Sequence, residues 1–413
     1  MAVRVILLGV LGLIGGAVAN HVIYRWCYFP RPISPWATPD GKAPPRRASD
    51  RIPVVGWFGL ARESSIHGRG FWLRPILIEI GLAVALPALY WFETQTGGLM
   101  PLAFRGAFIP TFEPWGTRIF FGHAILLLLM TAATFIDFDE QTIPDAITIP
   151  GTILALALAS VSTMGFMPAD IVMPNGAAGL TPTTFDLPWL KPIAQWTTSK
   201  GLVAGGLIWT AWCFALADRR LILRKGLAKA VEFFLAGLFR YPTWKLLVAI
   251  WCTGLGLISV VWWWGGTHWQ GLFSGLVGLA VGGGIVWAIR IVASGAMRVE
   301  AMGFGDVTLM AMIGAFIGWQ GAVAAFFLSP FAAIAIIVVQ YIVTRNPRVP
   351  FGPYLCAGTV LTILYWDRVY NEAIAPNFAV LGNFVLWMCL ALLGLMGGLL
   401  FVWRLIKEAI FTD

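Results

Sequence analysis

Long apolar runs fill most of the chain and are separated by short polar or basic segments. An α-helix of about 20 apolar residues crosses the roughly 30 Å hydrocarbon core of a bilayer. About eleven runs reach or approach that length, so the pattern predicts an all-α polytopic membrane protein. The expected spans are residues 5–24, 75–92, 118–136, 147–166, 201–217, 246–264, 272–294, 307–321, 323–343, 352–368 and 380–404.

Composition supports the membrane setting and excludes an ordinary soluble domain. Of the 413 residues, 59% are hydrophobic and 12% are charged, whereas soluble domains are roughly 45 to 50% apolar. The five cysteines are scattered and form no CxxC pair. They are therefore expected to be reduced apolar fillers, and no structural metal is expected.

The placement of Lys and Arg predicts the orientation. Residues 25–74 carry nine Lys or Arg and three Asp or Glu, and short loops with such an excess stay in the cytoplasm. The N-terminus is therefore expected outside. Alternation then places Asp137, the basic loop near 218–245 and the turn at 303–306 on the cytoplasmic side. The segment 25–74 is also rich in proline, so it is expected to be a small irregular region, and its charge could contact anionic lipid.

A second interpretation of the first apolar run stays open. Arg4, the apolar stretch 5–18 and the sequence at 17–19 also resemble a secretory signal with an A-x-A cleavage site. Cleavage there would invert every later loop and break the charge rule at each one. A retained first helix is favoured for that reason.

Two carboxylates occur where apolar runs meet polar segments, namely Asp137 and Asp306. Ionisable groups at the edge of a membrane span are costly, so they are functional candidates by default. Two neighbouring carboxylates cannot both ionise cheaply, which supplies an acid and a base in one site. Such a pair can activate water against a peptide carbonyl without a metal or a covalent intermediate.

Gly303 and Gly305 flank the approach to Asp306. Without side chains they let a peptide backbone come close and let the chain turn sharply into the next helix. The alternative is that Asp306 only caps that helix and the glycines only form the turn. This tetrapeptide by itself leaves both interpretations open.

The segment after Asp137 is polar and then turns into another apolar run. Pro144 is expected to fix a turn, and Asp145 to cap the next helix in a mainly structural role. Asp139 and Glu140 are expected to be solvated loop charges.

Several motifs, taken in order, resemble the type IV prepilin peptidases, the GxGD-type intramembrane aspartic proteases. They are residues 15–25 (GGAVANHVIYR), 52–57 (IPVVGW), 74–79 (RPILIE), 136–150 (IDFDEQTIPDAITIP), 301–307 (AMGFGDV) and 350–353 (PFGP). The resemblance implies that Asp137 and Asp306 are catalytic. It also implies a protein of the bacterial inner membrane that cleaves the basic leader of prepilins or pseudopilins at the cytoplasmic face. Many members also N-methylate the product, with S-adenosylmethionine as cofactor; that activity stays open here.

Three departures from the family pattern are visible. The first loop lacks the paired CxxC motifs that commonly bind zinc. The two aspartates are 306 − 137 = 169 positions apart, which is unusually far, and Thr308 replaces the usual lysine. The chain is accordingly divided into a first helix, a basic loop, helices with the first aspartate, an insertion, and helices with the GxGD motif. These segments are residues 1–24, 25–74, 75–166, 167–245 and 246–413.

Two further polar residues lie inside predicted spans. Glu79 is expected to face the interior and pair with another group, and it is a weak candidate for cofactor binding. His123 is expected to be an interior hydrogen-bonding group rather than a proton relay.

Other functional classes remain as alternatives. A secondary transporter also carries paired intramembrane carboxylates, often within internal repeats, but neither aspartate motif has a second copy. An inactive component of a pilus or secretion machine could keep the fold without the activity, although both aspartates are retained. Membrane lipid and the pilin substrate are the expected partners, and no nucleic-acid partner is expected.

Overall fold

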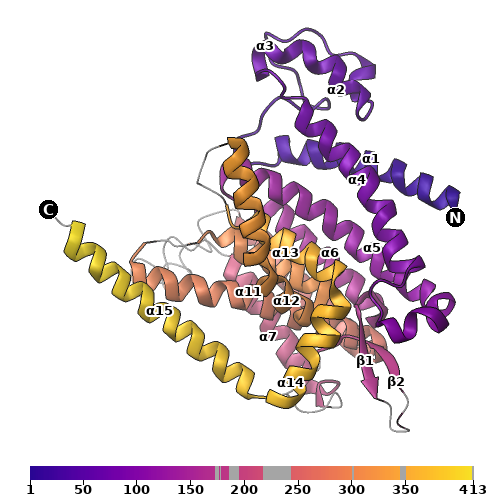
Figure 1. Cartoon of the computed structure of the whole chain (residues 1–413), viewed down its shortest axis with the longest axis vertical. Coiled ribbons are helices and arrows are strands. Elements are labelled where there is room, and N and C mark those ends of the chain that lie inside the picture. Colours follow the sequence, from indigo (N-terminus) through magenta and orange to yellow (C-terminus); the bar gives the residue numbers. More distant parts are fainter. Residues whose placement is uncertain are drawn as a thin grey trace.

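Helices make up nearly all of the computed structural model, which describes residues 1–172, 176, 178–185, 195–216, 243–299, 302–344 and 350–411 (Figure 1). Eight helices within these ranges are long and apolar enough to cross a membrane. The chain is therefore a polytopic helical membrane protein, as the apolar pattern predicts. The expected basic loop near 218–245 lies almost entirely outside the described residues.

The predicted count of eleven spans is not confirmed, because some of the expected helices are short or joined. Helix α6 (Asp145–Val161) has 17 residues and α13 (Gly352–Leu364) has 13, so both are shorter than a full span. The expected spans 307–321 and 323–343 both lie within α12 (Phe304–Thr344), whose helical backbone is interrupted at Gly318. The apolar pattern locates the helices but does not reveal which of them are partial spans.

The chain reverses direction at Gly318. Its backbone has φ 75° and ψ 171°, a conformation that is essentially restricted to glycine. A Cβ on Gly314 would lie 3.4 Å from the Cβ of Ala322, eight positions later, whereas eight residues of straight helix span about 12 Å. The two halves of α12 therefore fold back on each other.

The N-terminal part packs three long helices around its own apolar core (Figure 1). Helix α1 lies along α4 and also contacts α5. Between α1 and α4 the chain forms a small subdomain of short helices at the end of the long ones. The elements are α1 (Ala2–Arg25), η1 (Ala48–Arg51), α2 (Val55–Leu60), η2 (Ala61–Glu63), α3 (Ser64–His67), α4 (Leu73–Tyr90), η3 (Trp91–Gln95) and α5 (Leu102–Glu140).

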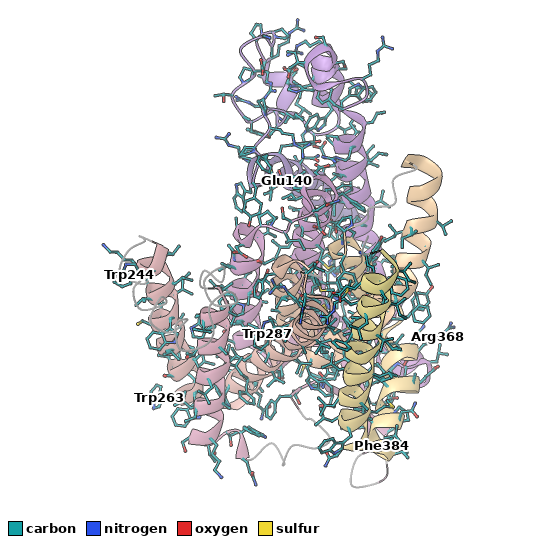
Figure 2. The ribbon with its side chains drawn as sticks, turned by 90° about the vertical axis from the view of Figure 1, so that its left-hand side faces the viewer. Glu140, Trp244, Trp263, Trp287, Arg368 and Phe384 are labelled. Carbon is teal, nitrogen blue, oxygen red and sulfur yellow. The ribbon has the colours of Figure 1, made fainter. Side chains whose placement is uncertain are left out.

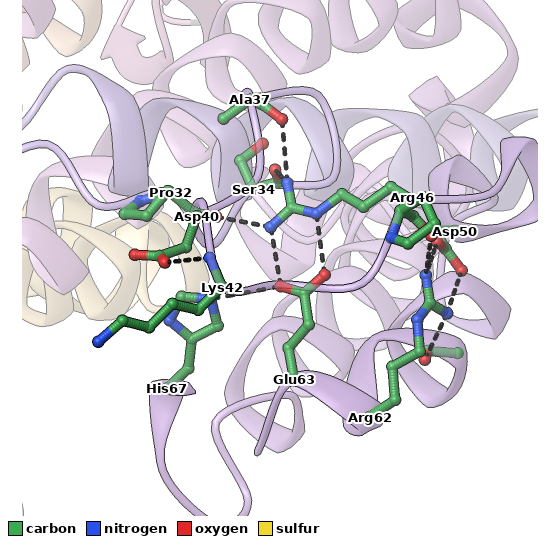
Figure 3. A network of polar contacts seen from close by, with 12 residues as sticks. Pro32, Ser34, Ala37, Asp40, Lys42, Arg46, Asp50, Arg62, Glu63 and His67 are labelled. Atoms are coloured by element: carbon green, nitrogen blue, oxygen red, sulfur yellow. Dashed lines mark hydrogen bonds and ion pairs between the residues drawn. The ribbon is translucent and has the colours of Figure 1, made fainter. Parts of the chain in front are cut away.

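A buried ion pair holds the small subdomain together (Figure 3). The Arg46 guanidinium donates to both oxygens of Glu63, at 3.1 and 3.0 Å, and also to the carbonyls of Pro32, Ser34 and Ala37. Both charged side chains are buried, and a buried pair is tolerated when further hydrogen bonds satisfy it. The subdomain thus has an internal polar centre although it contains no CxxC pair.

The remaining helices form the second part of the bundle. Helices α6, α11, α12 and α13 pack together, and α7 and α10 pack beside α11. Figure 2 shows Glu140 toward the end of the molecule that carries the small subdomain, and Phe384 and Trp263 toward the opposite end. The elements are η4 (Thr163–Gly165), α7 (Ser199–Leu216), α10 (Thr243–Trp264), α11 (Gly266–Met297), η6 (Asp367–Ile374), α14 (Ala375–Leu381) and α15 (Phe384–Phe411).

One small sheet departs from the all-α expectation. Strands β1 (Pro168–Val172) and β2 (Ala178–Pro182) form an antiparallel hairpin in which Asp170 is opposite Leu180. The Trp366 indole donates to the carbonyl of Pro168 at 2.7 Å. The hairpin falls in the predicted outer loop, where an analysis of apolar runs finds no element.

Replacement of Gly318 by alanine tests the reversal in α12. Alanine can adopt the backbone conformation of Gly318 only with strain. We expect the change to lower the free energy of unfolding by about 1 to 3 kcal/mol, which is measured as a lower midpoint of thermal unfolding in detergent. Gly284→Ala is the matched control, because a Cβ at Gly284 meets open space. Equal midpoints for the two variants would contradict the assigned backbone conformation.

Candidate active site

Asp137 lies in the last turn of α5, where the long helix ends. The N–H of Gln141, which has a left-handed backbone, donates to the carbonyl of Asp137 and closes the helix. The Asp137 side chain is 4% exposed, and its Oδ2 accepts a hydrogen bond of 3.0 Å from the N–H of Gly352. Asp137 thus joins the end of α5 to the beginning of α13.

Asp306 lies in the first turn of α12, directly after the glycine turn. Its side chain is 8% exposed, and a Cβ on Gly303 would lie 3.5 Å from its Oδ2. Nearby, Arg290 of α11 donates to the carbonyl of Met302 at 2.8 Å and holds the start of the turn.

The structure brings the two aspartates together from distant parts of the chain. Their carboxylates lie within electrostatic range of each other, and the Cys356 thiol of α13 is within range of both. Ile143 provides a second link, because a Cβ on Gly305 would lie 2.9 Å from the Ile143 Cβ and a Cβ on Gly352 would lie 2.8 Å from its Cδ1. The loop between α5 and α6 therefore packs against the backbone beside both acids.

Short helices create the setting of this pair. Both α6 and α13 begin beside the site, and neither is long enough to cross the bilayer. Glycines at 303, 305 and 352 leave the backbone around the carboxylates without side chains. The arrangement offers two buried acids beside backbone that carries no side chains, and a pair of acids of this kind is what acid and base hydrolysis of a peptide needs.

Asp139 is not a solvated loop charge, so that expectation is wrong. Its carboxylate pairs with Arg74 through two contacts of 2.7 and 2.8 Å and with Arg31 at 2.7 Å. The Arg74 guanidinium also lies over the rings of Tyr24 and Phe135. Its partners are 65 and 108 positions away, so nothing local in the sequence reveals the cluster.

Glu140 also has partners, again contrary to expectation. Its two oxygens accept from the N–H groups of Tyr28 and Phe29 at 2.8 and 3.0 Å. Together with Asp139 it fastens the last turn of α5 to the segment that follows α1. Asp145, by contrast, is exposed in the first turn of α6, where Pro144 occupies the N-cap position.

Glu79 faces the interior and is paired, as the sequence predicts. It is 1% exposed and accepts from the side chains of Asn20 and Trp57 at 3.1 and 2.8 Å and from the Val54 N–H at 2.5 Å. The backbone of Val54 has φ 62°, which is rare for a β-branched residue. The carboxylate thus joins α1, α4 and the small subdomain.

His123 is an interior hydrogen-bonding group, as expected. Its Nδ1 lies 2.6 Å from Oε1 of Glu93, and both side chains are buried. Nothing in the sequence pattern singles out Glu93 as its partner. Within the described ranges, no three His, Cys, Asp or Glu side chains are grouped as a metal site requires.

Comparison with known proteins identifies the segment that contains Asp306. Residues 242–338 match the type IV leader peptidase family. This part of the chain is similar to type IV leader peptidases. The matched stretch contains the glycine turn and Asp306 but not Asp137.

Curated relatives agree with the family match. The prepilin leader peptidase/N-methyltransferase of Pseudomonas putida is 32% identical over 118 residues, which are 28% of this chain and 39% of the relative. The protein of that name from Aeromonas salmonicida (strain A449) is 33% identical over 89 residues, 21% of this chain and 29% of the relative. The one from Pseudomonas aeruginosa is 32% identical over 102 residues, 24% of this chain and 33% of the relative.

The resemblance inferred from the sequence motifs is therefore confirmed. Its reach is limited, since the chain spans at most 39% of the length of these three relatives. No solved structure matches the chain.

Glu79→Ala tests the interior carboxylate. The change removes the acceptor of three hydrogen bonds, those from Asn20, Trp57 and the Val54 N–H, and hydrogen bonds to charged groups contribute about 1.5 to 3 kcal/mol each. We expect a drop of several degrees in the thermal midpoint and faster proteolysis of the subdomain at residues 26–72. Glu79→Gln keeps part of the acceptor capacity and should lose less, so an equal or larger loss in Glu79→Gln would contradict the assigned role.

Proposed function

We propose that the protein is an aspartic endopeptidase that removes the basic leader from type IV prepilins or pseudopilins. The single observation that carries this proposal is the convergence of Asp137 and Asp306, two buried carboxylates within electrostatic range beside three glycines. The match of residues 242–338 supports the same function. It also favours a peptidase over a transporter or an inactive scaffold.

In this proposal the two aspartates share the acid and base roles. One carboxylate takes a proton from a water molecule placed between them, and the resulting hydroxide attacks the scissile carbonyl. The other, which is protonated, donates to the carbonyl oxygen and so stabilises the tetrahedral intermediate. The first aspartate then gives the proton that it took from water to the leaving amine as the peptide bond breaks, which leaves that aspartate ionised and its partner protonated, as at the start.

The proposed setting is the cytoplasmic face of the bacterial inner membrane. A prepilin leader is followed by an apolar helix, which can lie in the bilayer beside the spans while its leader backbone reaches the glycines. Gly303 and Gly305 would then line the approach of the substrate. The excess of Lys and Arg in residues 25–74 supports a cytoplasmic orientation of this end.

Methylation is a separate question. The names of the relatives include N-methyltransferase, and such an activity would use S-adenosylmethionine as methyl donor. Glu79 does not fit as a ligand of that cofactor, because its carboxylate is buried and already accepts from three internal donors. We therefore assign Glu79 a structural role and derive no methyl-transfer step.

Asparagine at either aspartate tests the dyad. We expect Asp137→Asn and Asp306→Asn each to lower cleavage of a prepilin in proteoliposomes by about 10² to 10⁴-fold, the usual contribution of a general acid or base. The amide keeps the size of the side chain, so thermal midpoints should change little. Gel shift or mass spectrometry of the processed pilin measures the outcome.

Asp145→Asn is the matched control, because Asp145 is an exposed carboxylate close in sequence to the site. It should retain nearly full activity. Full activity in Asp137→Asn or in Asp306→Asn would refute the dyad, and loss only in Asp145→Asn would move the first catalytic carboxylate to that position.

Gly352→Ala tests how Asp137 is positioned. The added Cβ would lie 2.5 Å from Asp137 Oδ2, so the carboxylate must move. A displacement of about 1 Å can cost about 10²-fold in rate, and we expect this loss in kcat.

Gly303→Ala gives the comparison, because its Cβ would make only an ordinary contact with Asp306. It should leave kcat largely intact and raise KM if the substrate backbone passes there. An unchanged kcat in Gly352→Ala would show that the contact with Asp137 does not matter for catalysis.

A further inference from the structure

Helix α2 in the small subdomain has the sequence VGWFGL, and its one polar side-chain group, the Trp57 indole N–H, is turned inward to Glu79. One face buries Trp57 and Leu60 in the N-terminal core. The other face is also apolar, and Val55 and Phe58 are 61% and 58% exposed. A helix that is apolar on all sides is normally buried in protein or lipid, so water does not account for the outer face.

The outer face of α2 continues into the membrane-facing side of α4. The Phe58 ring contacts Trp72 with 5.4 Å between centroids, and Trp72 directly precedes α4. From there an exposed apolar stripe follows α4 at helical spacing. Its members are Leu73, Leu77, Ile80 and Val84. Since α4 is a candidate membrane span, this stripe is the side of α4 that faces lipid.

A basic and aromatic pair precedes this face in the sequence. Ile52, which is exposed, lies between the face and Arg51 in the sequence, and the Arg51 guanidinium lies 5.3 Å from the centre of the Trp36 ring. Tryptophan and arginine are typical of the headgroup layer, where an apolar body and a polar tip are both accommodated. Basic side chains near the membrane surface are attracted to anionic headgroups.

The neighbouring helix of the subdomain is different. The exposed positions on and just after α3 are Ser65, Gly68 and Arg69, none of which is apolar. Apolar exposure in the subdomain thus occurs on α2 and its junction with α4, and separately on the segment that follows α1, where Trp26, Tyr28 and Phe29 are exposed, but not on α3.

We propose that Ile52, Val55 and Phe58 lie in the headgroup layer and anchor the small subdomain to anionic phospholipid, with Arg51 and Trp36 at the polar edge. These five residues form the anchoring face. The anchor fixes the subdomain at the membrane surface beside the ends of α1 and α4. This inference is independent of the proposed peptidase activity.

Spin labels at single cysteines in nanodiscs test the anchoring face. Cys252→Ser with Cys389→Ser gives a background without exposed thiols, because Cys27, Cys213 and Cys356 are buried. Labels are placed by Phe58→Cys, by Leu77→Cys as a lipid-facing reference and by Ser65→Cys as a water-facing reference. Collisions with a neutral aqueous nickel complex and with oxygen, which concentrates in lipid, report the environment of each label.

We expect the label at position 58 to collide severalfold less with the nickel complex, and more with oxygen, than the label at position 65. The ratio of nickel collisions to oxygen collisions at position 58 should fall toward the ratio at position 77. A label at position 58 as open to the nickel complex as that at position 65 overturns the proposal and indicates a face for a soluble protein partner.

The lipid charge is tested with the same label. Nanodiscs that contain phosphatidylglycerol should give less nickel access at position 58 than nanodiscs of phosphatidylcholine alone, and Arg51→Gln should remove the difference. No effect of lipid charge in the unsubstituted background would refute the anionic part of the proposal. Neither measurement depends on cleavage of a prepilin, so failure here and failure of the peptidase function are distinguishable.

Discussion

Close contact between helix backbones at glycine is the interaction on which the rest of this structure depends. Inside a bilayer, lipid tails are as apolar as leucine, so helices associate through close van der Waals packing rather than through exclusion of water. Gly278 of α11 and Gly314 of α12 face each other so closely that a Cβ on either would lie about 2 Å from the carbonyl oxygen of the other. The same contact type joins α1 to α4 at Gly12 and Gly16. The contact between Gly278 and Gly314 helps to position Asp306, because it sets how closely the first half of α12, which begins beside Asp306, approaches α11.

Polar contacts, rather than close packing at glycine, fix the position of the C-terminal end of α5. Asp139 pairs with Arg74 and Arg31, and Glu140 accepts from the backbone after α1. Asp137 lies in the same turn, and among the described residues its carboxylate accepts one hydrogen bond, from the N–H of Gly352. Two of these neighbouring carboxylates thus tie the helix end to the N-terminal part of the chain, and the third, Asp137, is the one to which we assign a catalytic role in the proposed function.

The sequence predicts the helical membrane class, the interior pairing of Glu79 and the two aspartates as a candidate pair, because each rests on a local pattern. It does not predict the partial spans α6 and α13, since an apolar run has the same composition whether it crosses the bilayer or stops inside the protein. It also fails for Asp139, whose charge partners are distant in sequence. The close helix contacts do have a sequence pattern that predicts them, namely glycines four positions apart at 12 and 16, 271 and 275, and 278 and 282. The catalytic role of the aspartates stays a prediction.

The long separation of the aspartates in sequence does not imply separation in space. After α6 the chain passes through the outer loop, α7 and α10, and it returns to the bundle in α11. There a Cβ on Gly271 would lie 2.1 Å from the carbonyl oxygen of Ala159, so α11 packs directly on the end of α6. Helices α7 and α10 lie against α11 rather than between α6 and α12. The described helices of this segment, α7 and α10, therefore lie beside α11, and the helices that carry and surround the two carboxylates stay in direct contact with one another.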